Sequence, residues 1–234
     1  MSEDNSYSLF KSFAEPLFSP WLCDENFLQI DSEYAEWLPD VMKPGRYLQY
    51  VLAKQAVLLI KGDFIECGVY QGKSASIFSS ILDKHDKYNK ELFLIDSYEG
   101  LDSPTEEDKD IRTKKPFFTK GGVKGHDVNT IKNKLNKHRC SINFIKGWIP
   151  DTFENIKNKT FSFAHIDVDL YQSTYDSLFF VYPRMEKGGI ILFDDYGFPM
   201  CTGARKAIDD FLLDKIEPLI PLPSGQALLI KSPC

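Results

Sequence analysis

The stretch FSFAHIDVDLYQSTYDSLFFVYPRMEKGGIILFDDYG, residues 161–197, predicts a strand, a helix and a second strand. The apolar runs at 161–168 and 188–195 have the length of buried strands, and a helix is predicted between them at 172–181. Each run closes on a pair of aspartates. Strands that alternate with helices indicate a parallel sheet, and ligands bind such sheets outside the carboxyl ends of the strands. The aspartates therefore predict where the chemistry lies.

Four carboxylates close these two strands, Asp167 and Asp169 on the first and Asp194 and Asp195 on the second. A charge beside a hydrophobic core is costly unless it is paired or binds a metal. Two neighbouring strand ends would bring three or four carboxylates around one point, and hard oxygen ligands suit Mg²⁺ or Ca²⁺. Strand periodicity puts Asp167 and Asp169 on one side. Asp194 and Asp195 can share an ion only if the strand ends before them.

The same alternation continues outward from this unit. Further strands are predicted at 63–67, 91–96, 142–147, 216–220 and 226–231, and further helices at 44–60, 73–83, 127–137, 150–156 and 203–214. The last two strands are joined by PLPSG, 221–225, which is too short for the crossover that parallel strands need. We therefore predict an α/β fold with a Rossmann-like, mostly parallel seven-stranded sheet and an antiparallel C-terminal hairpin.

Two segments lie outside this pattern. Residues 1–45 are rich in aromatic residues and proline, and we predict a helical cap on a single main domain, 46–234. The segment 97–127 has no periodicity and is first acidic, then basic. A loop of about thirty residues in a compact domain is usually functional or disordered. We predict a lid over the site, the alternative being a solvated excursion.

The composition argues against several classes of protein. A net charge of −6 and a pI near 5.3 do not provide the basic patch of a nucleic-acid-binding protein. No apolar stretch approaches the roughly 18 residues of a membrane helix, and the acidic start MSEDNSYSLF is not a signal peptide. Five scattered cysteines without a CxxC pair favour reduced thiols and a cytoplasmic enzyme.

The turn ECGVYQGKS, residues 66–74, follows the strand at 63–67 and opens a helix. A Walker A loop needs four residues before Gly-Lys-Ser where this chain has three, and the GxGxxG fingerprint lacks its middle glycine. An adenosyl cofactor without a pyrophosphate fits better. Gly68 would let the backbone approach it, the helix N-terminus would receive a carboxylate, and Asp96 would accept from the ribose hydroxyls. The alternative is a turn that only packs helix on strand.

Six segments, in this order, resemble the macrocin O-methyltransferase family: FIECGVYQGKSA, LIDSYEGL, KGWIPDTF, HIDVDLYQST, YPRMEKGGIILFDDYG and GARKAIDDF. The match covers about 62–215. The resemblance implies a class I methyltransferase fold and an enzyme dependent on S-adenosylmethionine and Mg²⁺. It further implies that the acceptor is a sugar hydroxyl of a natural product or a surface glycan.

The resemblance also assigns residues by position. Those implied at the cofactor are Glu66, Gly68, Tyr70, Gly72, Ser74, Asp96, Ser97, Gly147, Trp148 and Asp167. Asp167, Asp194 and Asp195 match the magnesium ligands, and Asp169 falls at the position of a proposed general base, with Asp167 beside it in the catalytic centre. His165 shares strand parity with both aspartates and is the alternative base.

Several rival interpretations stay open. Asp167-Val-Asp169 is also a DxD pattern, which holds a nucleotide-sugar metal in glycosyltransferases. An O-methyltransferase for a non-sugar hydroxyl and a scaffold without activity are further alternatives. Asp167 and Asp169 could instead form ion pairs with Lys146 or Arg205, and Asp194 with Asp195 could merely cap the next segment. The aromatic N-terminal segment would suit a homodimer contact.

Overall fold

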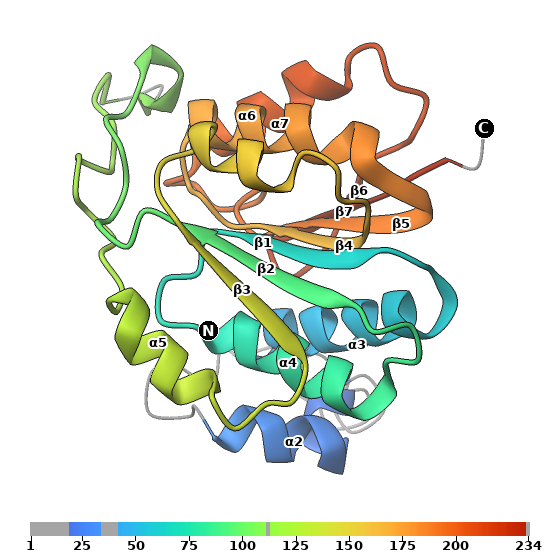
Figure 1. Ribbon diagram of the computed structural model, residues 1–234. Helices are drawn as coiled ribbons and strands as arrows, with labels where there is room; N and C mark the ends of the chain where they lie inside the picture. Colours follow the sequence, from blue (N-terminus) through green and yellow to red (C-terminus); the bar gives the residue numbers. More distant parts are fainter. Residues whose placement is uncertain (1–18, 34–41, 111–112, 233–234) are drawn as a thin grey trace, which may run out of the picture.

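The computed structural model describes residues 19–33, 42–110 and 113–232. Seven strands form one sheet in the order β3-β2-β1-β4-β5-β7-β6 (Figure 1). The first five strands in the chain are parallel, and β7 is antiparallel to both β5 and β6. The strands are β1 Asp63–Cys67, β2 Glu91–Asp96, β3 Ser141–Lys146, β4 Phe161–Ile166, β5 Met185–Phe193, β6 Ile220–Pro221 and β7 Ala227–Ile230. The predicted fold class, including the antiparallel terminal hairpin, is confirmed.

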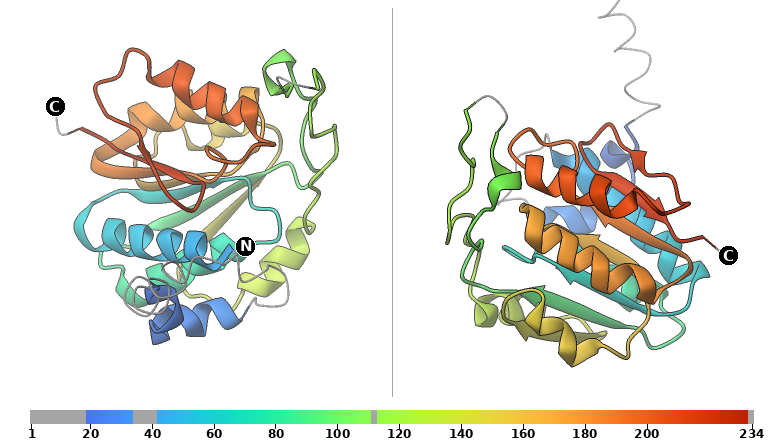
Figure 2. Two further views of the ribbon diagram at one scale, coloured as in Figure 1. Left: turned by 180° about the vertical axis from the view of Figure 1, so that it is seen from behind. Right: turned by 90° about the horizontal axis from the view of Figure 1, so that it is seen from above.

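Helices cover both faces of the sheet (Figures 1 and 2). The α-helices are α2 Glu25–Ser32, α3 Lys43–Leu59, α4 Lys73–His85, α5 Val128–Leu135, α6 Tyr171–Val181 and α7 Thr202–Leu212. Short 3₁₀ helices are η1 Pro20–Leu22, η4 Glu106–Asp108, η5 Asp151–Ile156 and η6 Tyr182–Arg184. On the face of α6 and α7 the core contains Phe161, Phe180 and Phe193, and on the opposite face Phe64 and Phe163 pack against helices α3 and α4.

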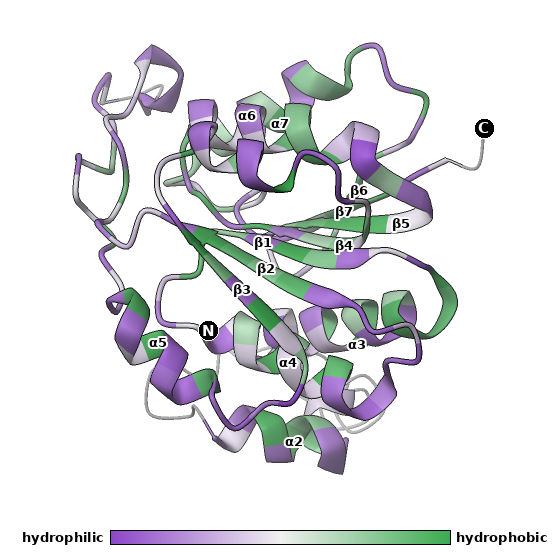
Figure 3. Cartoon of the chain, viewed as in Figure 1, coloured by the Kyte–Doolittle hydropathy of each residue, from purple (hydrophilic) through white to green (hydrophobic). Residues whose placement is uncertain are grey.

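Burial on both faces explains why the strands are apolar runs with little alternation. Figure 3 shows hydrophobic strands at the centre and hydrophilic residues on the outer surfaces of the helices. Among the described residues, none of the helices combines the length and the apolar character that crossing a membrane requires.

The strands end earlier than predicted at the edge that carries the aspartates. β4 stops at Ile166 and β5 at Phe193, so all four carboxylates lie beyond their strands. Asp167 and Asp169 both line the same cavity, but strand periodicity is not the reason, because both lie beyond β4 and the chain turns at Asp169, whose φ of 60° is left-handed. The condition set for Asp194 and Asp195, that the strand ends before them, is met.

Other boundaries also differ. β5 begins at Met185, three residues before the predicted start, because a register shift against β4 accommodates the glycines that follow. β6 is shorter than predicted, since Pro218 and Pro221 offer no N–H for a longer ladder. The helix predicted at 150–156 is the 3₁₀ helix η5. Asp127 caps α5 as predicted, accepting from the backbone of residues 129 and 130.

The N-terminal segment, for which a helical cap was predicted without bounds, contains the regular helix α2. Asp24 caps it by accepting from Phe27 N at 3.1 Å. Its last turn carries the buried Asp31, which pairs with Arg46 at 2.6 Å and with Lys73 at 3.4 Å. The described part of the N-terminal segment is therefore tied to α3 and to the first residue of α4. The rest of the predicted cap, at 1–18 and 34–41, lies outside the described residues.

Candidate active site

A cavity of about 550 Å³ opens at the carboxyl ends of the parallel strands. Ten of the site residues inferred from the sequence line it: Gly68, Tyr70, Asp96, Ser97, Gly147, Trp148, Asp167, Asp169, Asp194 and Asp195. Four others do not line it, namely Glu66, Gly72, Ser74 and His165. The sequence therefore located the site, and the structure divides the predicted residues into a lining set and a set behind it.

Glu66 and Ser74 face the core. The Glu66 carboxylate is fully buried, accepts from Ser74 Oγ, and lies 3.0 Å from His165 Nδ1. Burial raises the pKa of Glu66, although His165 and Ser74 oppose this shift. Neither of these two side chains therefore lines the cavity in which a cofactor would bind. Gly72, with φ of 80°, starts α4 and faces Ile131.

Gly68 is required by a close approach of two backbones. Its φ is 88°, and a Cβ atom there would lie 1.7 Å from the carbonyl oxygen of Asp167. We expected Gly68 to make room for a ligand, but the neighbouring strand end already excludes a side chain. Asp96 supports the same turn, because its Oδ2 accepts from Val69 N at 2.7 Å and from Tyr70 N at 3.1 Å.

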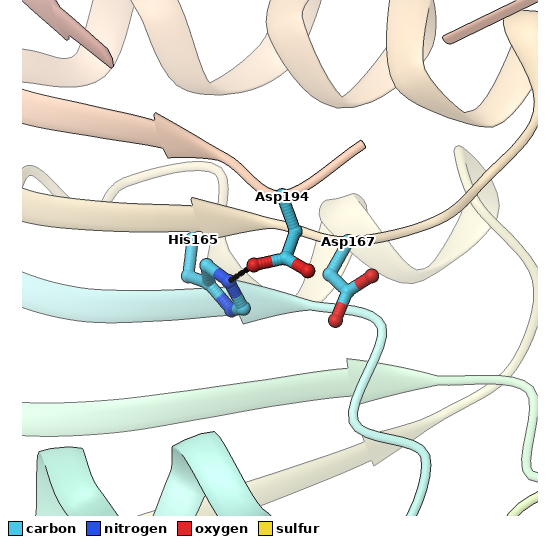
Figure 4. A group of neighbouring side chains, drawn as sticks. All are labelled: His165, Asp167 and Asp194. Atoms are coloured by element: carbon cyan, nitrogen blue, oxygen red, sulfur yellow. Dashed lines mark hydrogen bonds and ion pairs between the residues drawn. The ribbon is translucent and has the colours of Figure 1, made fainter. Parts of the chain in front are cut away.

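The four aspartates form two groups that cross between strands. His165, Asp167 and Asp194 place ligand atoms within 4.8 Å of one another (Figure 4). The second group consists of Asp169, Asp195 and Cys201, whose ligand atoms also lie within 4.8 Å of one another. The expectation that carboxylates of the two strand ends meet agrees with this geometry, but the predicted ligands Asp167, Asp194 and Asp195 fall in different groups. Cys201 was missed because it stands outside any motif, six residues after Asp195.

Asp194 is held tightly on one oxygen. Its Oδ1 accepts from Gln226 Nε2 at 2.6 Å and from Gln49 Nε2 at 3.2 Å, and it lies 3.4 Å from His165 Nε2. Burial alone would raise the pKa of Asp194, but the hydrogen bonds from His165, Gln226 and Gln49 lower it below its usual value. Neither glutamine carried a signal in the sequence.

Asp167 and Asp195 have no lysine or arginine partner among the described residues, although the charge of His165 lowers the pKa of Asp167 in part. Burial, with the neighbouring charges of Asp194 and Asp195, raises the pKa of Asp167 well above its usual value. Burial and the charges of Asp169 and Asp194 do the same to Asp195, whose Oδ2 accepts from Asp169 N at 2.9 Å. Within the described residues, the carboxylate of Asp167 has no hydrogen bond.

Asp169 lies in the second group, where Cys201 Sγ is 3.6 Å from its Oδ1. Burial raises the pKa of Asp169 to about 6, with the charge of Asp194 adding to the shift and Cys201 opposing it. The alternative ion pairs are wrong, since Lys146 pairs with Glu99 at 3.1 Å and Arg205 Nε donates to Tyr196 O.

The electrostatics of the cavity fit a hard divalent cation. No lysine or arginine is among the described residues that line it, and only Lys11 and Arg112 lie in the parts left undescribed. Buried carboxylates in such surroundings are costly unless a metal neutralises them. Oxygen donors of this kind suit Mg²⁺ or Ca²⁺.

His165 cannot act as the base for an acceptor in the cavity. It is fully buried, lies between Glu66 and Asp194, and stacks edge-on to Phe78 at 5.5 Å. Burial alone would lower its pKa, but the hydrogen bonds to the two carboxylates raise it well above the usual value. A buried imidazolium between two acids stabilises them.

Residues from the described part of the segment 97–127 line one side of the cavity. Figure 2 (right) shows the described part of this segment, in green, at one side of the sheet. The apolar residues that it contributes are Tyr98, Leu101, Phe117, Phe118 and Val123. At one point Asp108 Oδ1 accepts from Tyr171 N at 2.8 Å, at the start of α6. At another, His126 N donates to Tyr70 O at 3.1 Å, over the glycine turn. The segment therefore connects the glycine turn with the helix that follows Asp169.

The order of the strands in the sheet places the glycine turn and Asp96 next to the carboxylates. At the ends of the neighbouring strands β3, β2 and β1 lie Trp148, Asp96 and Gly68, and the carboxylates follow directly after β4 and β5. The model of the family described as macrocin O-methyltransferase matches residues 46–219, which is most of the chain. The chain belongs to the macrocin O-methyltransferase family. That family membership confirms the resemblance found in the sequence.

Curated relatives of this macrocin O-methyltransferase family member are similar but longer. The demethyldecarbamoylnovobiocin O-methyltransferase of Streptomyces niveus is 26% identical over 155 residues, 65% of this chain and 58% of that protein. The 8-demethyl-8-(2,3-dimethoxy-alpha-L-rhamnosyl)-tetracenomycin-C 4'-O-methyltransferase of Streptomyces olivaceus is 25% identical over 167 residues, 70% of this chain and 63% of that protein. The chain thus spans less than two thirds of either relative.

Solved structures share the fold. The crystal structure of the calicheamicin methyltransferase CalS11 superposes with a TM-score of 0.69 at 22% identity, covering 80% of this chain and 79% of that one. This likeness supports the class I methyltransferase architecture of the sheet.

Proposed function

We propose that the protein transfers a methyl group from S-adenosylmethionine to a sugar hydroxyl, with Mg²⁺ bound at the aspartates. The observation that carries the proposal is the group of buried and half-buried carboxylates that no lysine or arginine of the described lining neutralises, in the same cavity as the glycine turn and Asp96. The family membership supports methyl transfer as the reaction.

The cofactor half of the cavity is the side where β1, β2 and β3 end. Gly68, Tyr70, Asp96, Ser97, Gly147 and Trp148 line it there, with Asp167 at the border toward the carboxylates. S-adenosylmethionine, when bound, supplies a methyl group activated by its sulfonium. Trp148 offers an aromatic face for the adenine, and Asp96 an acceptor for the ribose hydroxyls. Glu66, Gly72 and Ser74 support the turn from behind.

The metal half of the cavity follows β4 and β5. Asp167 and Asp194 would hold the cation together with Asp195, whose charge already acts on Asp167. A divalent cation there, when bound, supplies Lewis-acid stabilisation of a developing alkoxide. Asp169 is the base, because a carboxylate with a pKa of about 6 is ionised at neutral pH and can take the hydroxyl proton.

The walls of the cavity favour an uncharged glycoside as acceptor. Nucleotide sugars carry a diphosphate, and the described lining contains no lysine or arginine to neutralise one. The same argument disfavours the DxD glycosyltransferase. Phe117, Phe118, Phe198 and Met200 offer an apolar surface for an aglycone. The tetracenomycin relative is named for a rhamnosyl acceptor of this kind, whereas CalS11 is described as a TDP-rhamnose 3'-O-methyltransferase, so the test below compares both kinds of acceptor.

Three further parts of the proposal concern the whole enzyme. Residues 46–234 form the methyltransferase domain, with residues 97–127 as its lid. Residues 1–45 form a cap beside the acceptor, and Met42 from this segment lines the cavity. The four described cysteines are free, in keeping with a cytoplasmic location. A homodimer through the N-terminal segment would appear in light scattering as twice the chain mass of 26.9 kDa.

The test is a methylation assay on a panel of acceptors. Purified protein is incubated with labelled S-adenosylmethionine and either rhamnosylated polyketides or nucleotide-activated rhamnose, with and without a chelator. We expect methylation of the glycosides, abolished by the chelator and restored by Mg²⁺. Full activity in the chelator would contradict the metal assignment. Methylation of the nucleotide sugars alone would contradict the acceptor assignment.

A further inference from the structure

One oxygen of Asp194 is fully occupied by the protein. Its Oδ1 is approached by nitrogen atoms of Gln226 at 2.6 Å, Gln49 at 3.2 Å and His165 at 3.4 Å. A carboxylate oxygen has two lone pairs, so three donors saturate it. Within the described residues, Oδ2 makes no hydrogen bond, and Figure 4 shows it on the side toward Asp167. Oδ2 is therefore the oxygen left for a ligand.

Each of the three donors comes from a different part of the fold. Gln49 lies on α3, His165 on β4, and Gln226 in the turn between β6 and β7. All three are buried. Fixing one carboxylate from three directions leaves little freedom for rotation about its χ2 angle. The geometry is that of a clamp on Asp194.

The donors are themselves held in place. Ser224 Oγ donates to Gln226 Oε1 at 2.9 Å, which leaves the amide nitrogen of Gln226 facing Asp194. The Glu66 carboxylate lies 3.0 Å from His165 Nδ1, opposite it in the register of β1 and β4, so Nε2 of the ring is directed to Asp194. Both orientations are thus set by a partner on the far side from the cavity.

We propose that Gln49, His165 and Gln226 are positioning residues that hold Asp194 Oδ1 so that Oδ2 is presented to the divalent cation. This inference rests on the proposed metal site. It also gives the C-terminal hairpin a role in function, since Gln226 lies beyond the residues that the family model matches. Groups that orient a metal ligand from behind typically change metal affinity or activity 10–100-fold when they are removed.

A purely structural role for the same residues makes a different prediction. Buried polar groups that only complete the core would affect folding and cofactor binding together. Positioning residues would affect the metal and leave the cofactor half, at the ends of β1 to β3, unchanged. The affinity for metal and the affinity for S-adenosylhomocysteine therefore separate the two roles.

The experiment measures Mn²⁺ binding to the chelator-treated full chain from the electron paramagnetic resonance signal of free Mn²⁺. The variants are Gln226→Met, Gln49→Met and the double variant, which keep side-chain volume and remove the donor. Gln55→Met, at an exposed position further along α3, is the matched control. Affinity for S-adenosylhomocysteine and circular dichroism are measured on each protein.

We expect each single variant to weaken Mn²⁺ binding about tenfold or more and the double variant further, whereas Gln55→Met matches the wild type. Affinity for S-adenosylhomocysteine should stay within about twofold, since these side chains lie away from Asp96 and Trp148. In the activity assay the Mg²⁺ concentration for half-activation should rise, with turnover at saturating Mg²⁺ largely kept.

The possible results decide separate claims. Unchanged Mn²⁺ affinity in all three variants would overturn the clamp and leave the metal site standing. Equal losses of metal and S-adenosylhomocysteine binding would also overturn it, in favour of a structural role. A wild-type protein that binds no Mn²⁺ while it binds S-adenosylhomocysteine would overturn the metal site itself, and the clamp with it.

Discussion

Asp169 sets the pH dependence of the proposed reaction. Its pKa is raised by burial to about 6 in the protein without a cation, and a bound cation nearby would lower it. Because the base must be ionised, the rate should rise with pH and level off, with its acidic limb at or below about pH 6. The measurement is kcat/KM between pH 5 and 9. A limb centred above pH 7.5 would assign the proton transfer to another group.

Removing that base separates it from the metal ligands. Asp169→Asn should lower turnover by a factor of about 10² to 10⁴, the usual contribution of a general base. Mn²⁺ affinity should stay near that of the wild type, because the Asp169 carboxylate lies outside the group formed by His165, Asp167 and Asp194, and Asp195 contacts the backbone N–H of Asp169, which the variant keeps. Loss of Mn²⁺ binding in this variant would show that Asp169 is itself a ligand.

The Asp167 carboxylate should lower the stability of the metal-free protein, although methylation requires it. Its carboxylate is buried next to like charges, so the metal-free protein carries an uncompensated cost. Asp167→Asn should therefore raise the free energy of unfolding of the metal-free protein by about 1–3 kcal/mol, while it abolishes methylation. Urea denaturation with and without Mg²⁺ measures the first effect. A less stable Asn variant would mean that the carboxylate has a stabilising partner.

At the scale of elements, the segment 97–127 depends on Asp108. Asp108 accepts from the first N–H of α6, and a Cβ on Gly203 would lie 1.8 Å from its Oδ1, so it fits between α6 and α7. Asp108→Ala should cost about 1 kcal/mol, as the loss of a helix cap does, and should loosen the segment. Hydrogen exchange at 97–110 should become faster than in the wild type. Equal protection would show that the segment is held elsewhere.

The turn after β1 gives a matched pair of glycine substitutions. Gly68→Ala and Gly121→Ala both place alanine at a left-handed φ, which costs about 1–2 kcal/mol. At Gly68 the added Cβ also meets Asp167 O at 1.7 Å, whereas at Gly121 the nearest atom is 4.0 Å away. Only Gly68→Ala should displace the end of β4 and weaken Mn²⁺ binding. Similar effects of both would contradict the close approach.

Sequence patterns predicted the elements and the antiparallel C-terminal hairpin well, and the exact strand ends and the partners of the aspartates less well. Buried parallel strands such as β2 are apolar runs of the right length, and Asp127 is a standard helix cap, so both could be located. The boundaries at Ile166 and Phe193 could not, because apolar residues continue up to the aspartates. Asp167 and Asp194 were grouped through the family resemblance, whereas the separation of Asp195 into a group with Asp169 and Cys201 became apparent only in the structure. Gln49 and Gln226 stand 145 and 32 residues from Asp194, in no motif.

At the scale of the whole molecule, the carboxylate cavity should make stability depend on pH and on metal. The pKa of Asp169 rises from 3.8 to about 6 on folding, so the folded protein binds the proton more tightly. Its stabilising contribution is full below about pH 3.8 and is lost as the pH rises through about 6. Asp167 and Asp195 shift in the same direction.

Mg²⁺ competes with protons for these oxygens, so it should raise Tm more at pH 8 than at pH 5. Glu217 accepts hydrogen bonds from Tyr182, Ser232 and Lys231, which outweigh burial and lower its pKa to about 2. Its contribution to stability therefore changes with pH only below about 4.5, outside the pH range of this test. Thermal melts of chelated protein at the two pH values, with and without Mg²⁺, provide the measurement. An equal or larger Mg²⁺ effect at pH 5 would contradict the proposed site.

The central claim is that this cavity binds a methyl-donor cofactor beside a divalent cation. Calorimetric titration of the chelated protein with S-adenosylhomocysteine, followed by titration of the complex with Mg²⁺, tests it most directly. We expect one saturable cofactor site per chain and a second, separate heat from one Mg²⁺, lost in Asp194→Asn. No binding of S-adenosylhomocysteine at concentrations up to about 1 mM would contradict the account.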